Sequence, residues 1–242
     1  MNWIICPVRN GLKYTQAALP TFLAQDIGDV AVLFIDNHST DGTAQWLRSL
    51  DSRRQPNGSL ILVRPKNPPW SVASSWNYGL RLVCDKKPRH EYALVVNNDV
   101  ILRPDTYSML VEQQVPFVSG VGVNDLKQIS LPMDHSFTKS PHPSFSCFLI
   151  RYECFRRVGP FDTRFKGAYC EDCDYHVRMH RVGIEAYAID LPFYHAGSGT
   201  LKSVSEEEAK KICEQADANR ALFREMYGCV PGTMEYDKLF ER

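Results

Sequence analysis

Runs of apolar, largely β-branched residues alternate with segments of helical pattern through the first hundred residues. The apolar runs are predicted strands, at Trp3–Cys6, Val30–Ile35, Leu60–Val63 and Tyr92–Val96. The segments between them are predicted helices, at Tyr14–Gln25, Asp41–Leu50 and Trp70–Val83. Such alternation is typical of a parallel sheet with helices on both faces. The pattern therefore predicts an α/β fold with a mostly parallel, doubly wound sheet flanked by helices.

Polar residues directly follow several of these strands. Pro7–Asn10, Asp36–Ser39 and Asn97–Asp99 each begin where an apolar run ends. In open α/β sheets, ligands bind in the crevice outside the carboxyl ends of the parallel strands. We therefore expect these segments to direct polar groups into one crevice.

The pattern loosens after residue 100, where short apolar runs at Phe117–Val123 and Phe145–Ile150 stand among proline- and glycine-containing stretches. Residues 130–144 form a predicted long loop. Long loops inside compact domains are often functional, so we expect a lid or an acceptor-binding loop there.

A final helix is predicted after residue 205. Ser205 and Glu208 have the spacing of a capping box, and apolar residues recur at helical spacing from Ala209 to Tyr227. Gly228 stands where a helix commonly ends. We interpret this helix as packing through its apolar stripe.

The composition is that of a soluble globular protein, with 242 residues of which 44% are hydrophobic and 23% charged. A chain of this length suits one large domain, or one domain with an extension, and can bury a full core. Lys plus Arg and Asp plus Glu each total 28, so the zero net charge gives no support to nucleic acid as a partner.

No targeting or membrane segment is indicated. The short apolar run Trp3–Cys6 has no basic residues before it and no cleavage-like site after it. No run approaches the ~18 apolar residues of a membrane span. The eight cysteines are scattered, several inside apolar runs, as expected of free thiols. We therefore expect a cytoplasmic protein without a transmembrane segment.

Acidic residues also form the strongest motif in the second half, Glu171-Asp172-Cys173-Asp174. It is followed by an isolated His195, which precedes Gly197. Carboxylate oxygens bind hard divalent cations, and such cations neutralise the charge that a polyphosphate leaving group develops. Acids at strand ends together with a late histidine thus suggest a site for a metal-bound polyphosphate.

Taken together, these motifs resemble the inverting GT-A glycosyltransferases of family 2, in a rhamnosyltransferase-like branch. The resemblance runs from about Trp3 to about Thr200 and rests on Asp36–Thr43, Asn97-Asn98-Asp99, Gly159–Phe165, Glu171–Asp174 with Arg178, and His195. It implies a GT-A domain over residues 1–200, with a nucleotide-sugar half (1–100) and an acceptor half (101–200). Residues 201–242 would be a C-terminal helical extension.

The resemblance also assigns the donor side of the site. It implies that the nucleotide of a UDP-, dTDP- or GDP-sugar is bound by four residues: Pro7, Asp36, Asn77 and Asn97. Asn97 replaces the first acid of the family's D-x-D motif. Asp99, at the last position of that motif, would bind Mn²⁺ or Mg²⁺ with His195.

The acceptor side follows from the same resemblance. Asp172 would be the general base that takes the proton of an acceptor hydroxyl, with Glu171 as a substrate-binding residue, an acceptor-side or supporting contact, and Asp174 as a structural residue. The implied activity is transfer of a sugar to a glycan or another hydroxyl acceptor, with inversion. An acceptor that is a modified nucleic-acid base is not excluded by these motifs.

Other functions stay open at this point. Cys170, Cys173, His176 and His180 have zinc-like spacings, although residues at these positions of one helix do not all share a face. A sugar-nucleotide nucleotidyltransferase would share the architecture, but Met1–Leu12 lacks the glycine-rich basic loop expected of one. The third alternative is a catalytically inactive nucleotide- or sugar-binding module.

Overall fold

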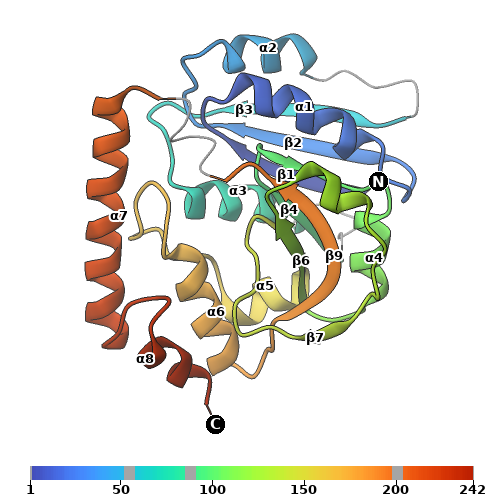
Figure 1. Cartoon of the computed structure of the whole chain (residues 1–242). Coiled ribbons are helices and arrows are strands. Elements are labelled where there is room, and N and C mark those ends of the chain that lie inside the picture. The colour runs from blue at the N-terminus through green and yellow to red at the C-terminus, as the bar shows by residue number, and fades with distance from the viewer. Residues whose placement is uncertain (1, 52–57, 85–90, 198–203, 242) are drawn as a thin grey trace.

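A single mixed sheet carries the fold. The computed structural model describes residues 2–51, 58–84, 91–197 and 204–241. The strands form a nine-stranded sheet in the order β3-β2-β1-β4-β8-β6-β9-β5, with β7 paired to β9 (Figure 1). The predicted α/β class is confirmed.

The first half of the sheet is parallel, as predicted. β1 pairs with β2 and β4, and β2 pairs with β3, all in parallel. Val8 lies opposite Asp36, and Asp36 opposite Pro65, so these strands end at one edge. The bounds are β1 Asn2–Val8, β2 Val30–Asp36, β3 Leu60–Pro65 and β4 Tyr92–Val96.

The second half of the sheet contains antiparallel strand pairs. The sequence predicted a mostly parallel sheet, and this prediction holds only for the first half. β8 lies antiparallel between β4 and β6, and β9 is parallel to β6 but antiparallel to β5 and β7. The regular strand–helix alternation, which supplies the crossovers that parallel strands need, is lost here. The bounds are β5 Val100–Ile101, β6 Phe117–Val123, β7 Phe137–Lys139, β8 Cys147–Arg151 and β9 Tyr187–His195.

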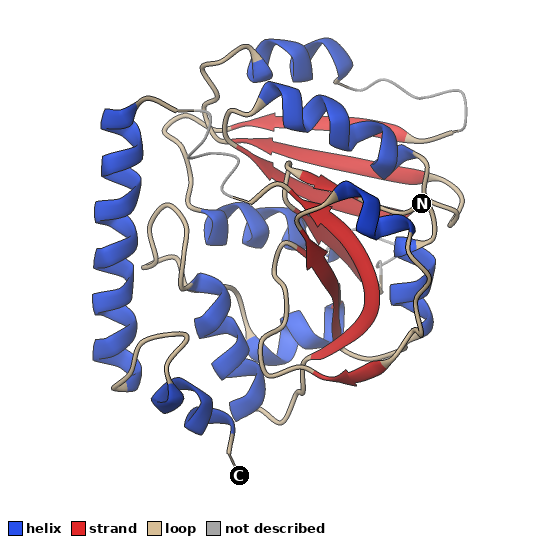
Figure 2. Ribbon diagram, in the orientation of Figure 1, coloured by secondary structure: helices blue, strands red, loops and turns tan. Residues whose placement is uncertain are grey.

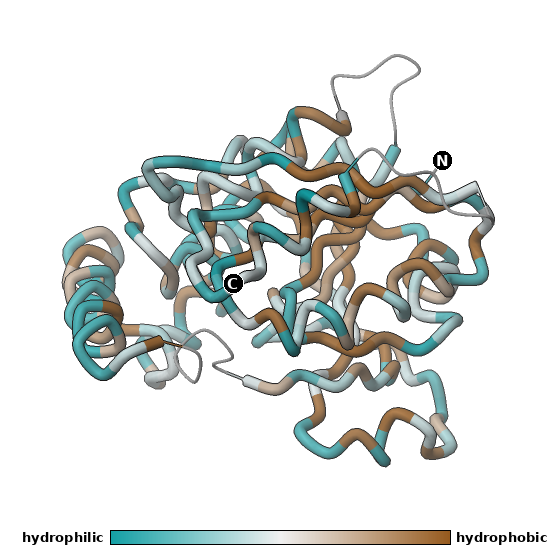
Figure 3. Tube along the Cα trace, turned by 90° about the horizontal axis from the view of Figure 1, so that it is seen from above, coloured by the Kyte–Doolittle hydropathy of each residue, from teal (hydrophilic) through white to brown (hydrophobic). Residues whose placement is uncertain are grey.

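Helices cover both faces of the sheet (Figure 2). Successive β1 residues point to opposite faces, so Ile4 packs with α1, α2 and α4, whereas Ile5 packs with α3, α5 and α6. The bounds are α1 Leu12–Leu23, α2 Thr43–Leu50, α3 Val72–Cys84, α4 Thr106–Glu112, α5 Tyr152–Val158 and α6 Glu171–Arg181. Figure 3 shows hydrophobic residues gathered along the central strands between these layers.

The C-terminal segment forms the predicted long helix, α7 (Glu206–Tyr227), followed by α8 (Met234–Asp237) and η3 (Lys238–Phe240). Ser205 Oγ accepts a hydrogen bond from the Glu208 N–H at 3.3 Å, and Gly228 ends the helix in the left-handed region with φ 75°. The N-cap at Ser205 and the end at Gly228 are thus confirmed, while the Glu208 side chain pairs with Arg9. The arrowheads of β2 and β3 point toward the side on which α7 stands (Figure 2). Within the described residues, no helix is long and apolar enough to span a membrane.

Candidate active site

One cavity of about 680 Å³ lies beyond the carboxyl ends of β1, β2 and β4. Its walls come from the strand-end loops, the start of α6, the end of β9 and one side of α7. Among the predicted site residues, it brings together Pro7, Asn97, Asp99, Glu171, Asp172 and His195.

The strand-end loops are held together by side chains that bond to neighbouring backbone. Asn10 N–H donates to Ser39 Oγ at 2.8 Å, and the Thr40 N–H donates to Asn10 Oδ1 at 2.8 Å. Asn98 Nδ2 donates to the Asn10 carbonyl at 3.1 Å and to Thr15 Oγ1 at 2.9 Å. The loops after β1, β2 and β4 therefore form one cross-linked rim, which fixes the direction of the neighbouring Asp99.

Asp99 and His195 meet across the edge of this rim. Asp99 Oδ1 lies 3.3 Å from His195 Nε2, and their side chains are 7% and 26% exposed. The pairing of β5 with β9 brings them together, because it places Val100 opposite His195. A carboxylate oxygen and an imidazole nitrogen thus lie close together on the cavity wall. Two adjacent ligand atoms of an octahedral ion with bonds of 2.0–2.1 Å are expected about 3 Å apart, which is close to the observed spacing.

Glu171 and Asp172 occupy the first turn of α6, where the helix dipole favours acids. Burial, together with the charge of Asp172, raises the pKa of Glu171 well above its usual range. Burial also raises the pKa of Asp172, although its carboxylate accepts a hydrogen bond from the Cys173 N–H at 2.8 Å. The cavity thus holds two carboxyl groups with elevated proton affinity.

The burial of Glu171 lowers the stability of the folded protein, and a variant should show this. The residue is 5% exposed, and among the described residues no donor reaches its buried Oε2. Because its pKa is higher in the folded than in the unfolded state, the folded protein holds the extra proton between the two values, and stability falls as pH rises through that window.

We therefore expect Glu171→Gln to raise Tm at pH 7 by at least about 3–6 °C, because glutamine folds without taking up a proton, an uptake that costs ~1.4 kcal/mol for each pH unit above the unfolded pKa. The gain should shrink toward pH 4, where Glu171 is protonated in both states. Differential scanning calorimetry between pH 4 and pH 8 measures it. Glu153→Gln, which alters an exposed glutamate, is the matched control. A Tm difference that is independent of pH would contradict this account.

Asp174 serves the packing of α6, as expected from the sequence. Its side chain is fully buried, pairs with Arg178 at 2.8 Å and accepts a hydrogen bond from the Tyr227 hydroxyl at 2.6 Å. These partners use its carboxylate to join α6 to α7. Asp174 does not line the cavity.

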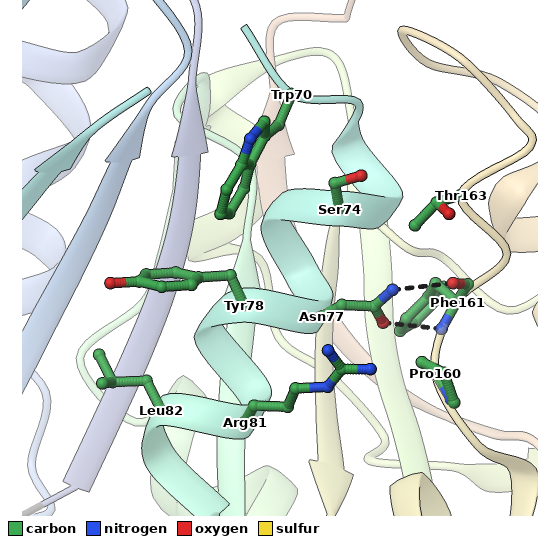
Figure 4. A pocket seen from close by; sticks show the side chains of 9 residues that line it. All are labelled: Trp70, Ser74, Asn77, Tyr78, Arg81, Leu82, Pro160, Phe161 and Thr163. Atoms are coloured by element: carbon green, nitrogen blue, oxygen red, sulfur yellow. Dashed lines mark hydrogen bonds between the residues drawn. The ribbon is translucent and has the colours of Figure 1, made fainter. Parts of the chain in front are cut away.

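Two predicted nucleotide contacts are not brought to the cavity. Asp36 is 3% exposed and accepts a hydrogen bond from the Ser39 N–H at 3.2 Å, while its neighbour Asn37 lines the cavity instead. Asn77 is bound on both sides of its amide by the Phe161 backbone, at 2.8 and 2.7 Å (Figure 4). It lies at a separate groove between α3 and residues 160–163. A nucleotide contact of either residue stays a prediction.

Several residues of the cavity were missed by sequence reasoning. They are Trp76, Gly167, Ala168, Tyr169 and, from α7, Glu208, Lys211, Ile212 and Gln215. Arg9 and Asn37, which also line it, fall within the strand-end segments that were expected at the crevice from the sequence. The α7 residues recur at helical spacing, but a polar stripe on a helix ordinarily indicates a solvated face. The predicted lid did not appear at the cavity, because β7 of residues 130–144 pairs with β9 and none of these residues lines the wall.

The zinc alternative is not supported by the surroundings of its residues. Burial raises the pKa of the Cys170 thiol to about 12 and that of Cys173 also upward, which disfavours the thiolate that zinc requires. His176 stacks on Phe240 with ring centres 4.2 Å apart. Across the part of the chain that the structure describes, no group of three or more His, Cys, Asp or Glu side chains is arranged to hold a metal. The cysteines whose side chains the structure describes are free, namely Cys6, Cys147, Cys154, Cys170, Cys173, Cys213 and Cys229.

Comparison with solved structures shows what the fold is. TarS of S. aureus superposes with a TM-score of 0.61 at 16% identity, covering 97% of this chain and 46% of that one. A mannosyltransferase from Pyrobaculum calidifontis, solved with GDP-Man and Mn²⁺, gives 0.64 at 17% identity, covering 98% and 77%. GalNAc-T7, solved with UDP, GalNAc and Mn²⁺, gives 0.64 at 12% identity, covering 100% and 54%. The chain thus spans about half of TarS and of GalNAc-T7.

Sequence comparison finds a family similarity for the first part of the chain. Among proteins of curated function, none matches the chain significantly by sequence. Residues 3–116 match the model of glycosyl transferase family 2, and this stretch includes β1 to β4, Asp99 and the rim of the cavity. Over residues 3–116, just under half of the chain, the sequence is thus similar to glycosyl transferase family 2, and the overall fold is the GT-A fold of glycosyltransferases.

Proposed function

We propose that this protein is a metal-dependent glycosyltransferase that moves a sugar from a nucleoside-diphosphate sugar to an acceptor hydroxyl, with inversion. The observation that carries the proposal is the single cavity in which Asp99, His195 and Asp172 come together on a family 2 framework. Similar folds were solved with GDP-Man, UDP and UDP-GlcNAc, which supports a nucleotide-sugar donor.

The donor nucleotide would lie along the strand-end rim. Pro7, Asn37 and Trp70 line one part of the cavity and offer apolar surface and an amide to the base. Asn97 lines the same cavity as Asp99, two residues before it in the chain, and is available to the ribose or the donor sugar. The diphosphate would then reach Asp99.

A divalent cation, Mn²⁺ or Mg²⁺, fits the residues beside the diphosphate. Asp99 Oδ1 and His195 Nε2 are suitable ligand atoms 3.3 Å apart, and oxygen atoms of the diphosphate would provide further ligands. Bound there, the cation would neutralise the charge of the leaving group. Two structural neighbours were solved with Mn²⁺.

Asp172 would act as the base. The acceptor oxygen attacks the anomeric carbon, the bond from that carbon to the diphosphate oxygen breaks, and the hydroxyl proton passes to the Asp172 carboxylate. Its raised pKa suits this task, because a general base works best when its pKa approaches the working pH. Glu171, whose pKa is raised further, would stay protonated and support the acceptor.

Screening nucleotides by thermal shift tests the proposal. At ligand concentrations near 100 times Kd, we expect UDP, dTDP or GDP to raise Tm by about 5–10 °C in the presence of Mn²⁺, since such binding stabilises by ~2.7 kcal/mol. EDTA should remove most of the shift. The matching nucleotide sugars are then incubated with the protein, and release of the nucleoside diphosphate is measured.

Each alternative predicts a different result. An inactive binding module would show the shift but no release of nucleoside diphosphate with any donor or acceptor. A nucleotidyltransferase would release pyrophosphate from a nucleoside triphosphate and a sugar phosphate. A protein that responds to no nucleotide with Mn²⁺ would contradict the proposal itself.

A further inference from the structure

The segment that leads into Asp172 has an unusual backbone. Tyr169 and Cys170 both lie in the left-handed region, with φ 82° and φ 70°, although neither is glycine. Residues in sparsely populated conformations cost of order 1–3 kcal/mol each and persist only where the surroundings hold them. Cys170 directly precedes α6, so its backbone sets the direction in which Glu171 and Asp172 leave the loop.

One buried side chain of α7 holds this segment. Asn219 is 2% exposed, and its Nδ2 lies within hydrogen-bond distance of the carbonyls of Lys166, Ala168 and Tyr169, at 2.8, 2.9 and 3.0 Å. Its Oδ1 accepts a hydrogen bond from the Lys166 N–H at 3.1 Å. The amide is thus used almost entirely on the loop of residues 166–169, with Gln215 Nε2 as its other partner at 3.2 Å.

The loop is also held from the opposite side. The Val72 N–H at the start of α3 donates to the Gly167 carbonyl at 2.7 Å. Residues 166–169 therefore lie between α3 and α7, bonded to both. Gly167, Ala168 and Tyr169 line the cavity, so the same short loop forms part of its wall.

The helix that carries Asn219 is itself fixed to the site. Glu208, near its start, pairs with Arg9 of the strand-end rim. Tyr227, at its end, donates to Asp174 of α6 at 2.6 Å. Between them, Phe223 packs with Phe165 and Cys170 in a buried cluster. α7 therefore spans from the nucleotide side of the cavity to the helix that bears the base.

We propose that Asn219 is a positioning residue for Asp172, and that α7 is for this reason a working part of the active site. The inference rests on the proposed function of Asp172. The two N–H groups of the amide, shared among the three carbonyls, offset the strain at Tyr169 and Cys170. Without them the loop relaxes, the first turn of α6 changes direction, and the Asp172 carboxylate moves away from the acceptor oxygen.

The surroundings of Asp172 determine what its pH dependence reports. The titratable groups nearest in the fold are Cys170, Glu171, Cys173 and Tyr236. The other titratable groups that share the cavity are Arg9, Asp99, His195, Glu208 and Lys211. Burial raises the pKa of each of the first four groups as well as that of Asp172. An acid limb of kcat that Asp172→Asn removes is therefore assigned to Asp172.

Asn219→Ala and Asn219→Asp test the proposal. The first removes every bond of the amide, and the second keeps the acceptor for Lys166 but turns a carboxylate oxygen toward three carbonyls. We expect kcat to fall about 10–100-fold in both, since a misplacement of about 1 Å costs up to 10²-fold. KM for the donor sugar, and the affinities for UDP and GDP with Mn²⁺, should change by less than about twofold, because the nucleotide side is untouched.

The pH profile separates positioning from general destabilisation. Loosening the loop admits water to Asp172, so the acid limb of kcat should move to lower pH in both variants. Leu47→Val, a change on the buried face of α2, which contributes no residue to the cavity wall, is the control that lowers stability alone. It should retain wild-type kcat and the wild-type acid limb.

Wild-type kcat and an unmoved acid limb in the Asn219 variants would overturn the proposal. If the wild-type protein turns over no donor, the proposed function fails. Hydrogen exchange of the folded variants then still tests whether Asn219 holds the loop of residues 166–169. Faster exchange of the Lys166 amide in Asn219→Ala than in Leu47→Val supports the inference that Asn219 holds the loop of residues 166–169. Equal exchange in the two variants overturns it.

Discussion

Asp172→Asn is expected to lower kcat by about 10²–10⁴-fold, the range that general-base catalysis contributes. Asparagine retains the size of the side chain and an oxygen that can accept the Cys173 N–H, so the first turn of α6 should persist. It cannot take the acceptor proton at any pH. Nucleotide affinity with Mn²⁺ should stay within about twofold of wild type, because the loss is confined to the transition state.

The same role for Asp172 predicts the direction in which kcat changes with pH. Only the ionised carboxylate accepts a proton, so wild-type kcat should rise with pH and level off above the raised pKa of Asp172. This acid limb should disappear in the asparagine variant. Asp217→Asn, the same change on an exposed residue of α7, should behave as wild type. Unchanged turnover by the Asp172 variant would refute its role as the base.

Asp99→Ala is expected to abolish the manganese-dependent part of nucleotide binding. Loss of outer-shell partners of a metal already costs about 10–100-fold in affinity, so loss of a direct ligand should lower the affinity for UDP or GDP with Mn²⁺ by at least that factor. Binding measured in EDTA, where no cation bridges protein and diphosphate, should differ little between variant and wild type. Isothermal titration with and without Mn²⁺ measures both quantities.

Two further variants define the metal role. His195→Gln should weaken the manganese response less than Asp99→Ala, since it removes a neutral ligand rather than a charge. Asp105→Asn, which changes a carboxylate paired with Arg103 outside the cavity, should leave that response intact. If Asp99→Ala kept the wild-type response to Mn²⁺, Asp99 would not be a ligand.

The local sequence pattern was sufficient to predict the strands and helices of the first half of the chain and the edge of the sheet at which the cavity lies. Strands and helices there follow from periodicities of two and 3.6 residues, which are properties of neighbouring residues. Once the strands are parallel, their carboxyl ends share an edge, and Pro7, Asn97 and Asp99 reach one cavity. The sequence could not predict that Asp36 and Asn77 would not line the cavity, because Ser39 and Phe161 become their hydrogen-bond partners only in the folded chain.

The sequence by itself determined the α/β class, the acidic motif at the start of α6 and the caps of α7, since each depends on residues within a few positions. Only the tertiary structure decided that α7 stands against the cavity and that Asn219 holds residues 166–169. A polar residue on a helix bonds as well to water as to a distant loop. Which of the two it does depends on packing between segments about fifty residues apart, and local sequence carries no record of that choice.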